Sequence, residues 1–431
     1  MMRWKNHPVA VLAVLVTLHL LAHVDRNMLV GFSPQIIRDL DLSNTQYGFL
    51  VGAVWVLSFG FMAMFMGSLA DRLPRPRLIA AGVAIWSICT AASGFAETFG
   101  QMVAARFFVA SGEAALVPAA VALLSDLYAP ERRAGATGIF FMGIPLGIGG
   151  AFLLSGTLGD LLGWRHTFFC LGAAGIAIAI PLSFLTEDRG PAGSAQHGEP
   201  FLPQMRALGR ALRNTPALPL AITAFVLVHV VFASLVFLQL WLVKERGQDA
   251  AAIATRIGGL QLLFGALGSL LGGLAGDRMA SRFKGGHASF AALIVGLAAP
   301  LMVACRFAPA GSPLFYAGLC AGFFMPLAVY GPAASLIQGL APPSMRATII
   351  GATMMAINLF AITLGNLAVG AAIDRLLAAG AAQPYTYVLL VTDLIAISSA
   401  GLFVLAARRM ICARNAANCS ADGALKAPLS R

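Results

Sequence analysis

Four ionisable residues lie in segments that are otherwise apolar enough for the interior of a membrane. Arg106 and Glu113 are the only charged residues in 102–124, and Asp25 with Arg26 interrupts the first apolar run of the chain. A charged group at membrane depth costs free energy, and it is retained where it faces a protein interior or a water-filled path. Two such clusters on different helices predict that the chain moves protons or charged solutes across a bilayer.

Reversible protonation of a carboxylate is the chemistry that these residues could perform. Desolvation favours the protonated form of a buried carboxyl group, whereas a nearby arginine favours the charged form. Exposing the group alternately to each side of the membrane would switch between the two forms. We therefore predict Asp25 and Glu113 as proton-coupling residues, with Arg106 and Arg26 as their electrostatic partners. The alternative is a fixed ion pair that only holds helices together, which fits Glu113 less well because its neighbours are small.

The composition indicates an integral membrane protein. Of the 431 residues, 59% are hydrophobic and 11% are charged, whereas soluble proteins have about 25% charged residues. The mean hydropathy is +0.82, which excludes an ordinary soluble core. A net charge of +11 would suggest nucleic acid as the partner of a soluble protein. Here we attribute it to basic cytoplasmic loops and expect no nucleic acid.

Twelve apolar runs of about 20 residues are long enough to cross a bilayer as helices. They cover 9–32, 46–69, 78–96, 101–124, 134–157, 166–186, 217–243, 255–276, 288–306, 312–338, 347–370 and 386–408. The segment between the sixth and seventh runs is rich in Gly and Pro, and its Arg206, Arg210 and Arg213 have the spacing of a surface helix. We predict an N-terminal six-helix bundle, a cytoplasmic linker, a C-terminal six-helix bundle and a cytoplasmic tail, at 1–186, 187–216, 217–408 and 409–431.

The distribution of basic residues predicts the orientation. With the N-terminus in the cytoplasm, twenty Lys and Arg residues fall on the cytoplasmic side and seven on the outer side, while Arg26 and Arg106 lie in the membrane. Cytoplasmic loops are enriched in Lys and Arg, so both termini are predicted to be cytoplasmic. The basic start resembles a signal peptide, but its apolar run is too long and is interpreted as a retained first helix. A bacterial inner membrane is the expected location.

An internal repeat supports this count of helices. The pattern Gly-x-x-x-Asp occurs at the ends of predicted helices 2, 5, 8 and 11, in 67–71, 156–160, 273–277 and 370–374. Helices 2 and 5 run in opposite directions, as do helices 8 and 11, which indicates inverted three-helix repeats within two parallel halves. The Gly allows close helix contact, and the Asp can bond an arginine or the N-terminus of a neighbouring helix.

This arrangement resembles the major facilitator superfamily. The resemblance implies an all-α membrane protein with 12 transmembrane helices in two pseudo-symmetric six-helix bundles. Segment 67–77 is similar to the superfamily's signature between helices 2 and 3, although Pro74 and Pro76 replace the usual Gly and Lys. The expected gating and loop residues are Gly67, Asp71, Arg72, Asp126, Arg132, Gly273, Asp277 and Arg278.

Within that superfamily, the first half resembles the Spinster-like transporters. The matching segments are Asp25-Arg26, Arg106 with Gly112-Glu113-Ala114, Pro118 with Ser125-Asp126-Leu127, residues 139–147 and Gly163-Trp164. The resemblance implies that Asp25 and Glu113 couple protons to transport, with Arg106 as electrostatic partner, and that the substrate is amphipathic and lipid-like. The anion:cation symporters share the Asp-Arg pair and the helix-4 pattern, so uptake of an organic acid or sugar acid is the alternative.

Polar residues inside other predicted spans are candidate substrate contacts. His229, Tyr330 and Asn358 of the second half, with His23 of the first, are the predicted substrate-cavity residues. Asp393, in predicted helix 12, is a charge for which the sequence identifies no partner.

The sequence therefore predicts a proton-coupled secondary transporter that works by alternating access on a small-molecule or lipid-like substrate. The proton gradient would drive it. We expect no cofactor, metal or enzymatic activity, because no nucleophile–base pair, ATP-binding loop or metal-ligand spacing occurs. Membrane lipid is an expected partner, and a monomer is the expected state. A non-transporting sensor or scaffold with the same fold is the second hypothesis.

Overall fold

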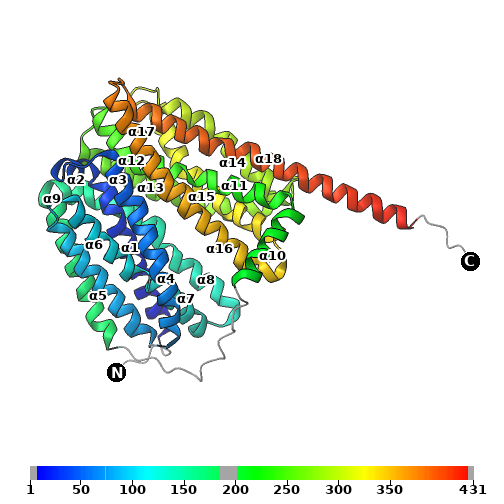
Figure 1. The fold of residues 1–431 in the computed structure, drawn as a ribbon, viewed down its shortest axis with the longest axis horizontal. Helices are drawn as coiled ribbons and strands as arrows, with labels where there is room; N and C mark the ends of the chain where they lie inside the picture. Colours follow the sequence, from blue (N-terminus) through cyan, green and yellow to red (C-terminus); the bar gives the residue numbers. More distant parts are fainter. Residues whose placement is uncertain (1–6, 73, 185–200, 426–431) are drawn as a thin grey trace, which may run out of the picture. The chain divides into compact units, whose positions relative to one another are not determined.

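The computed structural model describes residues 7–72, 74–184 and 201–425. Every regular element in these ranges is a helix (Figure 1). Twelve helical segments of the described chain are long and apolar enough to cross a membrane, and each overlaps one of the twelve predicted runs. The all-helical prediction is therefore confirmed, and the chain is a multi-pass membrane protein.

The backbone divides into two compact units. Unit 1 comprises Met1–Gln196, Ala233–Leu263 and Ile362–Leu389, and unit 2 comprises His197–Phe232, Phe264–Ala361 and Leu390–Arg431. Unit 1 thus includes parts of predicted helices 7, 8, 11 and 12 together with the first six. The predicted limits of the two bundles, linker and tail stay predictions, and residues 187–200 of that linker lie outside the described residues.

Most helices belong to one unit. Unit 1 contains α1 (Pro8–Gly31), α2 (Ser33–Asp39), α3 (Asn44–Gly48), the π-helix η2 (Phe49–Ala53), α4 (Val54–Arg72), α5 (Arg75–Gly94), α6 (Phe99–Glu113), α7 (Leu116–Leu127), α8 (Pro130–Phe141), α9 (Gly143–Ser183), most of α12 (Val231–Lys244) and α17 (Gly365–Ala378). Unit 2 contains α10 (Phe201–Asn214), α11 (Ala217–His229), α14 (Gly286–Cys305), α15 (Pro313–Leu340), the 3-10 helix η3 (Pro343–Met345) and α16 (Arg346–Ala356). Besides α12, whose first two residues belong to unit 2, three helices contribute residues to both units: α13 (Ala250–Ala280), the π-helix η4 (Ile357–Leu364) and α18 (Pro384–Leu425).

Predicted helix 4 is interrupted next to one of its charged residues. Instead of one continuous run, α6 ends at Glu113 and α7 begins at Leu116. Pro118 explains the break, because proline has no backbone N–H and its ring clashes with the carbonyl four residues earlier, that of Ala114. Glu113 consequently sits at the end of a helix within a membrane span.

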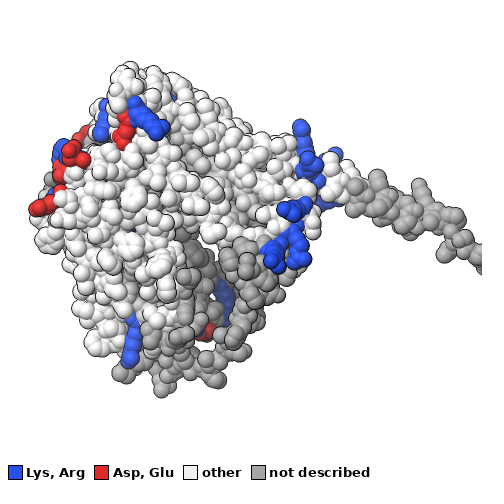
Figure 2. Space-filling view, viewed as in Figure 1, with Lys and Arg blue, Asp and Glu red and all other residues white. Residues whose placement is uncertain are grey.

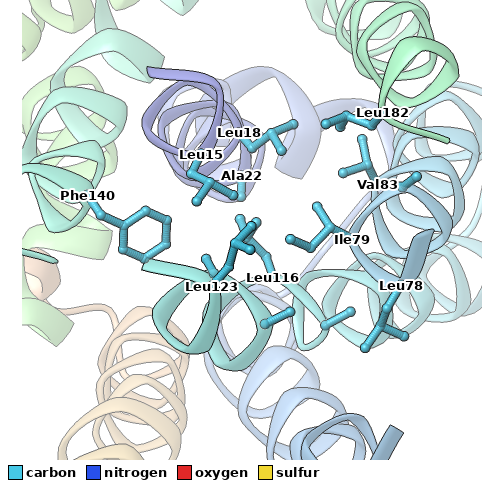
Figure 3. Close-up of a cluster of buried hydrophobic side chains, with 14 of the residues drawn as sticks. Leu15, Leu18, Ala22, Leu78, Ile79, Val83, Leu116, Leu123, Phe140 and Leu182 are labelled. Carbon is cyan, nitrogen blue, oxygen red and sulfur yellow. The ribbon is translucent and has the colours of Figure 1, made fainter. Parts of the chain in front are cut away.

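A cluster of apolar side chains holds six helices of unit 1 together (Figure 3). It contains buried residues of α1, α5, α6, α7, α8 and α9, among them Leu15, Leu18, Ala22, Leu78, Ile79, Val83, Leu116, Leu123, Phe140 and Leu182. Lipid is as apolar as these side chains, so close van der Waals packing is what holds such helices together. The cluster fixes α1, which bears Asp25 and Arg26, against α5 and α7.

Glycines bring the helices around the charged residues into backbone contact. A Cβ atom added to Gly112 would come within 2.6 Å of the Gly82 carbonyl oxygen, so α6 and α5 touch directly beside Glu113. A Cβ atom on Gly147 of α9 would overlap the side chain of His23 on α1. These contacts hold α5 against α6 and α1 against α9. They leave each pair of helices little freedom to shift and so determine where the charged side chains lie.

Helix α10 has the amphipathic character predicted for the linker. Arg206, Arg210 and Arg213 are exposed, whereas Ala211 on the other side of the helix is buried. Basic side chains gather over α10 in Figure 2. The cytoplasmic location of this helix stays a prediction.

Candidate functional site

Asp25 and Arg106 form a buried ion pair between α1 and α6. Arg106 Nη1 donates to Asp25 Oδ1 over 3.1 Å, and the two side chains are 2% and 5% exposed. Thr90 on α5 donates its hydroxyl to the second carboxylate oxygen, Oδ2, over 2.7 Å. The Arg106 guanidinium also lies 4.4 Å from the ring centre of Phe168. Both oxygens of Asp25 therefore accept a hydrogen bond in a site that excludes solvent.

Arg26 and Glu113 form a second pair. Arg26 Nη2 donates to Glu113 Oε2 over 2.8 Å, and the indole N–H of Trp55 on α4 donates to the same oxygen over 2.8 Å. The Arg26 guanidinium lies 3.5 Å from the ring centre of Trp55. Glu113 is 2% exposed, whereas Arg26 is 27% exposed. One member of this pair is therefore buried and the other reaches the surface.

Several polar atoms of the two pairs have no hydrogen-bond partner among the described residues. They are Glu113 Oε1, Arg26 Nε, and Nε and Nη2 of Arg106. A buried polar atom without a partner costs about 1–3 kcal/mol, and natural proteins keep few of them. The four side chains thus form a cluster of zero net charge whose bonding is incomplete, and whose net charge a single proton would change.

The structure brings together all four residues that the sequence placed in a proton-coupling site. Asp25 meets Arg106, and the charge of Asp25 acts on Glu113 as well. The direct partner of Glu113 is Arg26. Their roles in proton coupling stay predictions.

Two residues of the cluster were missed by the sequence analysis. Thr90 and Trp55 both lie inside predicted spans, where a hydroxyl or an indole N–H needs an acceptor. This need for an acceptor was the only sign in the sequence that Thr90 and Trp55 could bond one of the buried carboxylates. The sequence could not show which acceptor each residue reaches, because Thr90 is 65 residues from Asp25 and Trp55 is 58 residues from Glu113.

His23 lies in unit 1, one turn from Arg26 on α1. Its Nδ1–H donates to the His19 carbonyl oxygen over 3.0 Å, and His19 Nδ1–H donates to the Phe140 carbonyl oxygen over 3.0 Å. The two rings meet edge to face with centres 4.6 Å apart. One nitrogen of each ring is therefore committed to a backbone carbonyl.

The other three predicted substrate-cavity residues gather in unit 2. The rings of His229 and Tyr330 have centres 5.8 Å apart. Tyr330 donates its hydroxyl to Met354 Sδ over 3.7 Å, and Asn358 Nδ2 donates to the Met354 carbonyl oxygen over 3.0 Å. His229 and Tyr330 also pack on Phe225. The structure thus forms an aromatic and amide surface from α11, α15, α16 and η4, while its role stays a prediction.

Asp393 is not the isolated charge that the sequence analysis described. Arg306, directly after α14, binds it through two hydrogen bonds, Nε to Oδ2 over 2.7 Å and Nη2 to Oδ1 over 3.2 Å. The side chains are 1% and 6% exposed. The sequence could not identify this partner, because Arg306 is 87 residues away from Asp393 along the chain.

The predicted gating and loop residues are only partly described. Gly67 and the side chains of Asp71, Arg72 and Asp277 lie outside the part of the chain for which surroundings are described. Asp126 forms an ion pair with Arg75 of α5, while Arg132 and Arg278 are exposed. A Cβ atom added to Gly273 would meet no heavy atom within 4 Å. The gating role of these residues stays a prediction.

The fourth copy of the repeat, at the end of α17, contacts a helix N-terminus. Asp374 Oδ1 accepts from N and Nδ2 of Asn44 over 3.0 and 2.8 Å, and Oδ2 accepts from N and Oγ1 of Thr45 over 2.8 and 2.6 Å. A carboxylate is favourable at this end of a helix because the unpaired N–H groups point at it. This is the contact that the repeat predicts for its Asp.

The same contact is close along its length. A Cβ atom on Gly370 would overlap the Asn44 carbonyl oxygen, and a Cβ atom on Gly48 would overlap that of Asn366. Tyr385 at the start of α18 donates its hydroxyl to Asn44 Oδ1 over 2.7 Å. The predicted outer ends of helices 2 and 11 therefore touch backbone to backbone.

No three His, Cys, Asp or Glu side chains of the described chain converge where a metal ion could bind.

Comparison with known proteins agrees with the fold. Residues 15–366 match the sequence family described as Major Facilitator Superfamily. The chain is 27% identical to the protein spinster of Drosophila melanogaster over 350 residues, which cover 78% of this chain and 57% of that protein. It is 28% identical to an MFS-type efflux pump of Mycolicibacterium smegmatis over 275 residues, covering 64% of this chain and 63% of the pump. The chain thus spans less than two thirds of the length of either relative.

A solved structure has the same fold. It is a bacterial homologue of the human lysosomal transporter Spinster in an inward-facing and unoccupied conformation. The TM-score is 0.81 with 23% sequence identity, and the match covers 94% of this chain and 97% of that one. The resemblance to Spinster proteins inferred from the first half of the sequence is thereby confirmed.

Proposed function

Because the chain belongs to the Major Facilitator Superfamily, we propose that it is a secondary transporter that couples movement of its substrate to a proton. The main observation behind this proposal is that the two carboxylate oxygens of Glu113 are bonded unequally. Its Oε2 accepts from Arg26 and from Trp55, while its Oε1 has no partner among the described residues. A proton can bind Oε1 without first displacing either donor.

Protonation of Glu113 would release Arg26. The neutral carboxyl group attracts a guanidinium far less than the carboxylate does, and the four-residue cluster would gain one positive charge. Arg26 is the only member of the cluster that reaches the surface to a substantial extent, at 27%. The freed guanidinium is then the group that an anionic substrate would meet.

The surroundings of Arg26 favour an amphipathic anion as substrate. Arg26 lies over Trp55, which stacks on Phe59 with ring centres 4.5 Å apart. A guanidinium beside two aromatic rings suits a molecule with an acidic group and an apolar body. A lipid-like or other organic anion is therefore the proposed substrate class.

Alternating access would require the contact between α17 and α3 to open. That contact includes hydrogen bonds from Asn44 and Thr45 to Asp374 and close glycine packing. Asp25 and Glu113 lie on other helices of the same unit. We assign the contact at Asp374 as the outer closure of the transport cycle.

The test is proton flux in liposomes. Purified protein would be reconstituted with a pH-sensitive dye inside, and a lysophospholipid, a sugar acid or a cationic drug would be added under an imposed pH gradient. We expect an anionic compound to collapse the gradient with the wild type, and E113Q to behave like empty liposomes. E97Q, which changes an exposed carboxylate in the same way, is the control. Unchanged flux in E113Q, or flux with none of the compounds, would overturn the proposal.

A further inference from the structure

Trp55 contacts both members of the Glu113–Arg26 pair through different parts of one ring system. Its indole N–H donates to Glu113 Oε2 over 2.8 Å. The face of the same ring lies under the Arg26 guanidinium, 3.5 Å from ring centre to carbon. An indole can therefore act at once as hydrogen-bond donor to the carboxylate and as a cation–π partner of the arginine.

The position of Trp55 is determined by the helix that bears it. One turn further along α4, the Ser58 hydroxyl lies 2.9 Å from the Ser111 hydroxyl, two residues before Glu113 on α6. Ser58 also bonds the carbonyl oxygen of Phe107. These contacts tie α4 to α6 close to both the indole and the carboxylate. On the N-terminal side, the π-helix η2 ends two residues before Trp55.

Resting on the function proposed above, we propose that Trp55 is a positioning residue for proton binding at Glu113. Its N–H holds Oε2 in the ion pair and thereby leaves Oε1 as the oxygen that receives the proton. Its ring keeps the Arg26 guanidinium beside the carboxylate. When Glu113 is protonated, Arg26 is therefore the cation that loses its ion-pair partner.

Other groups also act on this cluster. Those facing it are Asp25, Arg26 and His23 on α1, Cys89 on α5 and Arg106 on α6. None of them donates to Glu113 Oε2 except Arg26. Removing the Trp55 donor therefore changes one of two bonds to that oxygen while the surrounding charges stay the same.

The variant W55F separates the two functions of the indole. Phenylalanine keeps an aromatic face for Arg26 but has no N–H, so the charged form of Glu113 loses one donor. Because hydrogen bonds to the charged form favour it, the pH at which half of the Glu113 groups are protonated should rise by about one pH unit. W55L, which loses the ring face as well, should shift the midpoint at least as far.

The readout is the infrared absorption of protonated carboxyl groups in the purified full-length protein, followed as a function of pH. The band that disappears in E113Q belongs to Glu113, and this assignment needs no substrate. W164F is the matched control. The Trp164 indole N–H also donates to a carboxylate, that of Asp39, over 2.9 Å, and it bonds neither Glu113 nor Arg26. The control should leave the Glu113 midpoint at its wild-type value.

Each outcome is informative. A W55F midpoint equal to that of the wild type would overturn the role of Trp55, even if E113Q abolishes proton-driven flux. If E113Q retains flux, the proposed function itself fails, whatever W55F does to the infrared midpoint. Should W55F not fold, the wild type still decides: its tryptophan emission should change over the same pH interval as the infrared band, and E113Q should remove that change. Tryptophan emission that does not change over the pH interval in which Glu113 titrates would contradict the inference.

Discussion

At the scale of residues, the two buried carboxylates differ in how many of their oxygens are bonded. Asp25 accepts from Arg106 through one oxygen and from Thr90 through the other. Glu113 accepts both of its hydrogen bonds through a single oxygen. Both oxygens of Asp25 are therefore hydrogen-bonded, whereas Oε1 of Glu113 has no partner among the described residues. The proposed function accordingly places the proton on Glu113, and a proton-coupling role for Asp25 stays a prediction.

This difference predicts unequal effects of neutralising the two residues. In D25N, Arg106 would remain buried without a counter-charge, which costs about 3–5 kcal/mol. In E113Q, the partly exposed Arg26 could turn toward solvent, so the loss of stability should be smaller. Thermal unfolding of the purified variants measures the loss of stability in D25N and in E113Q. The double variant D25N/R106Q should regain part of the stability, and an E113Q variant less stable than D25N would contradict this expectation.

The pairing itself could be only partly predicted from sequence. Helical spacing places Arg106 and Glu113 on the same face of α6, about 10 Å apart along the axis, so two partners at different heights were to be expected. Asp25 and Arg26 are consecutive and point in directions about 100° apart. Which of them faces α6 and which faces Trp55 depends on the rotation of α1, and that rotation is determined by packing against α5, α7 and α9.

At the scale of elements, apolar runs located the membrane spans but not their interruptions. Pro118 and Pro145 were visible in the sequence, yet the runs that contain them were interpreted as continuous. The structure ends α6 at Glu113 and α8 at Phe141, in each case four or five residues before the proline. A proline opposes the carbonyl four residues earlier, which is where the breaks occur. The π-helices η2 and η4 have no comparable signal.

The contact between α17 and α3 is the element whose strength can be tested directly. D374N would replace the carboxylate that accepts four hydrogen bonds from Asn44 and Thr45. Losing one charge-assisted hydrogen bond, worth about 1.5–3 kcal/mol, should raise the population of the locally open state roughly 10- to 150-fold. Hydrogen–deuterium exchange should therefore be faster in α3 and α17. D126N, which removes the ion pair with Arg75, is the control and should leave these two helices unchanged. Equal exchange in D374N and the wild type would show that Asp374 does not hold the contact.

At the scale of the whole molecule, the fourfold Gly-x-x-x-Asp repeat was the most informative part of the sequence. It indicated the family before any comparison, because helices 2, 5, 8 and 11 occupy equivalent positions in inverted repeats. In the structure, the copy at Gly370 and Asp374 makes the helix-terminus contact that the pattern implies. The division of the chain into units was not predictable, since parts of predicted helices 7, 8, 11 and 12 group with the first half.

Orientation in the membrane is the prediction that belongs to this scale. Twenty basic residues on one side against seven on the other predict cytoplasmic termini. A fluorescent protein that folds only in the cytoplasm, fused after Arg431, should therefore fluoresce. Fusion to a loop predicted on the outer side, such as that between α14 and α15, should give no fluorescence. The opposite result for the two fusions would reverse the assigned orientation and the location of every predicted gate.

The free oxygen of Glu113 has a kinetic consequence. Since no bond within the cluster must break before a proton arrives, loading of the carboxyl group can be as fast as proton delivery to it, and the slow event comes afterwards, when Arg26 leaves its former partner. The rate of turnover would then be governed by the motion of a charged side chain and its helix, and heavy water should slow it little.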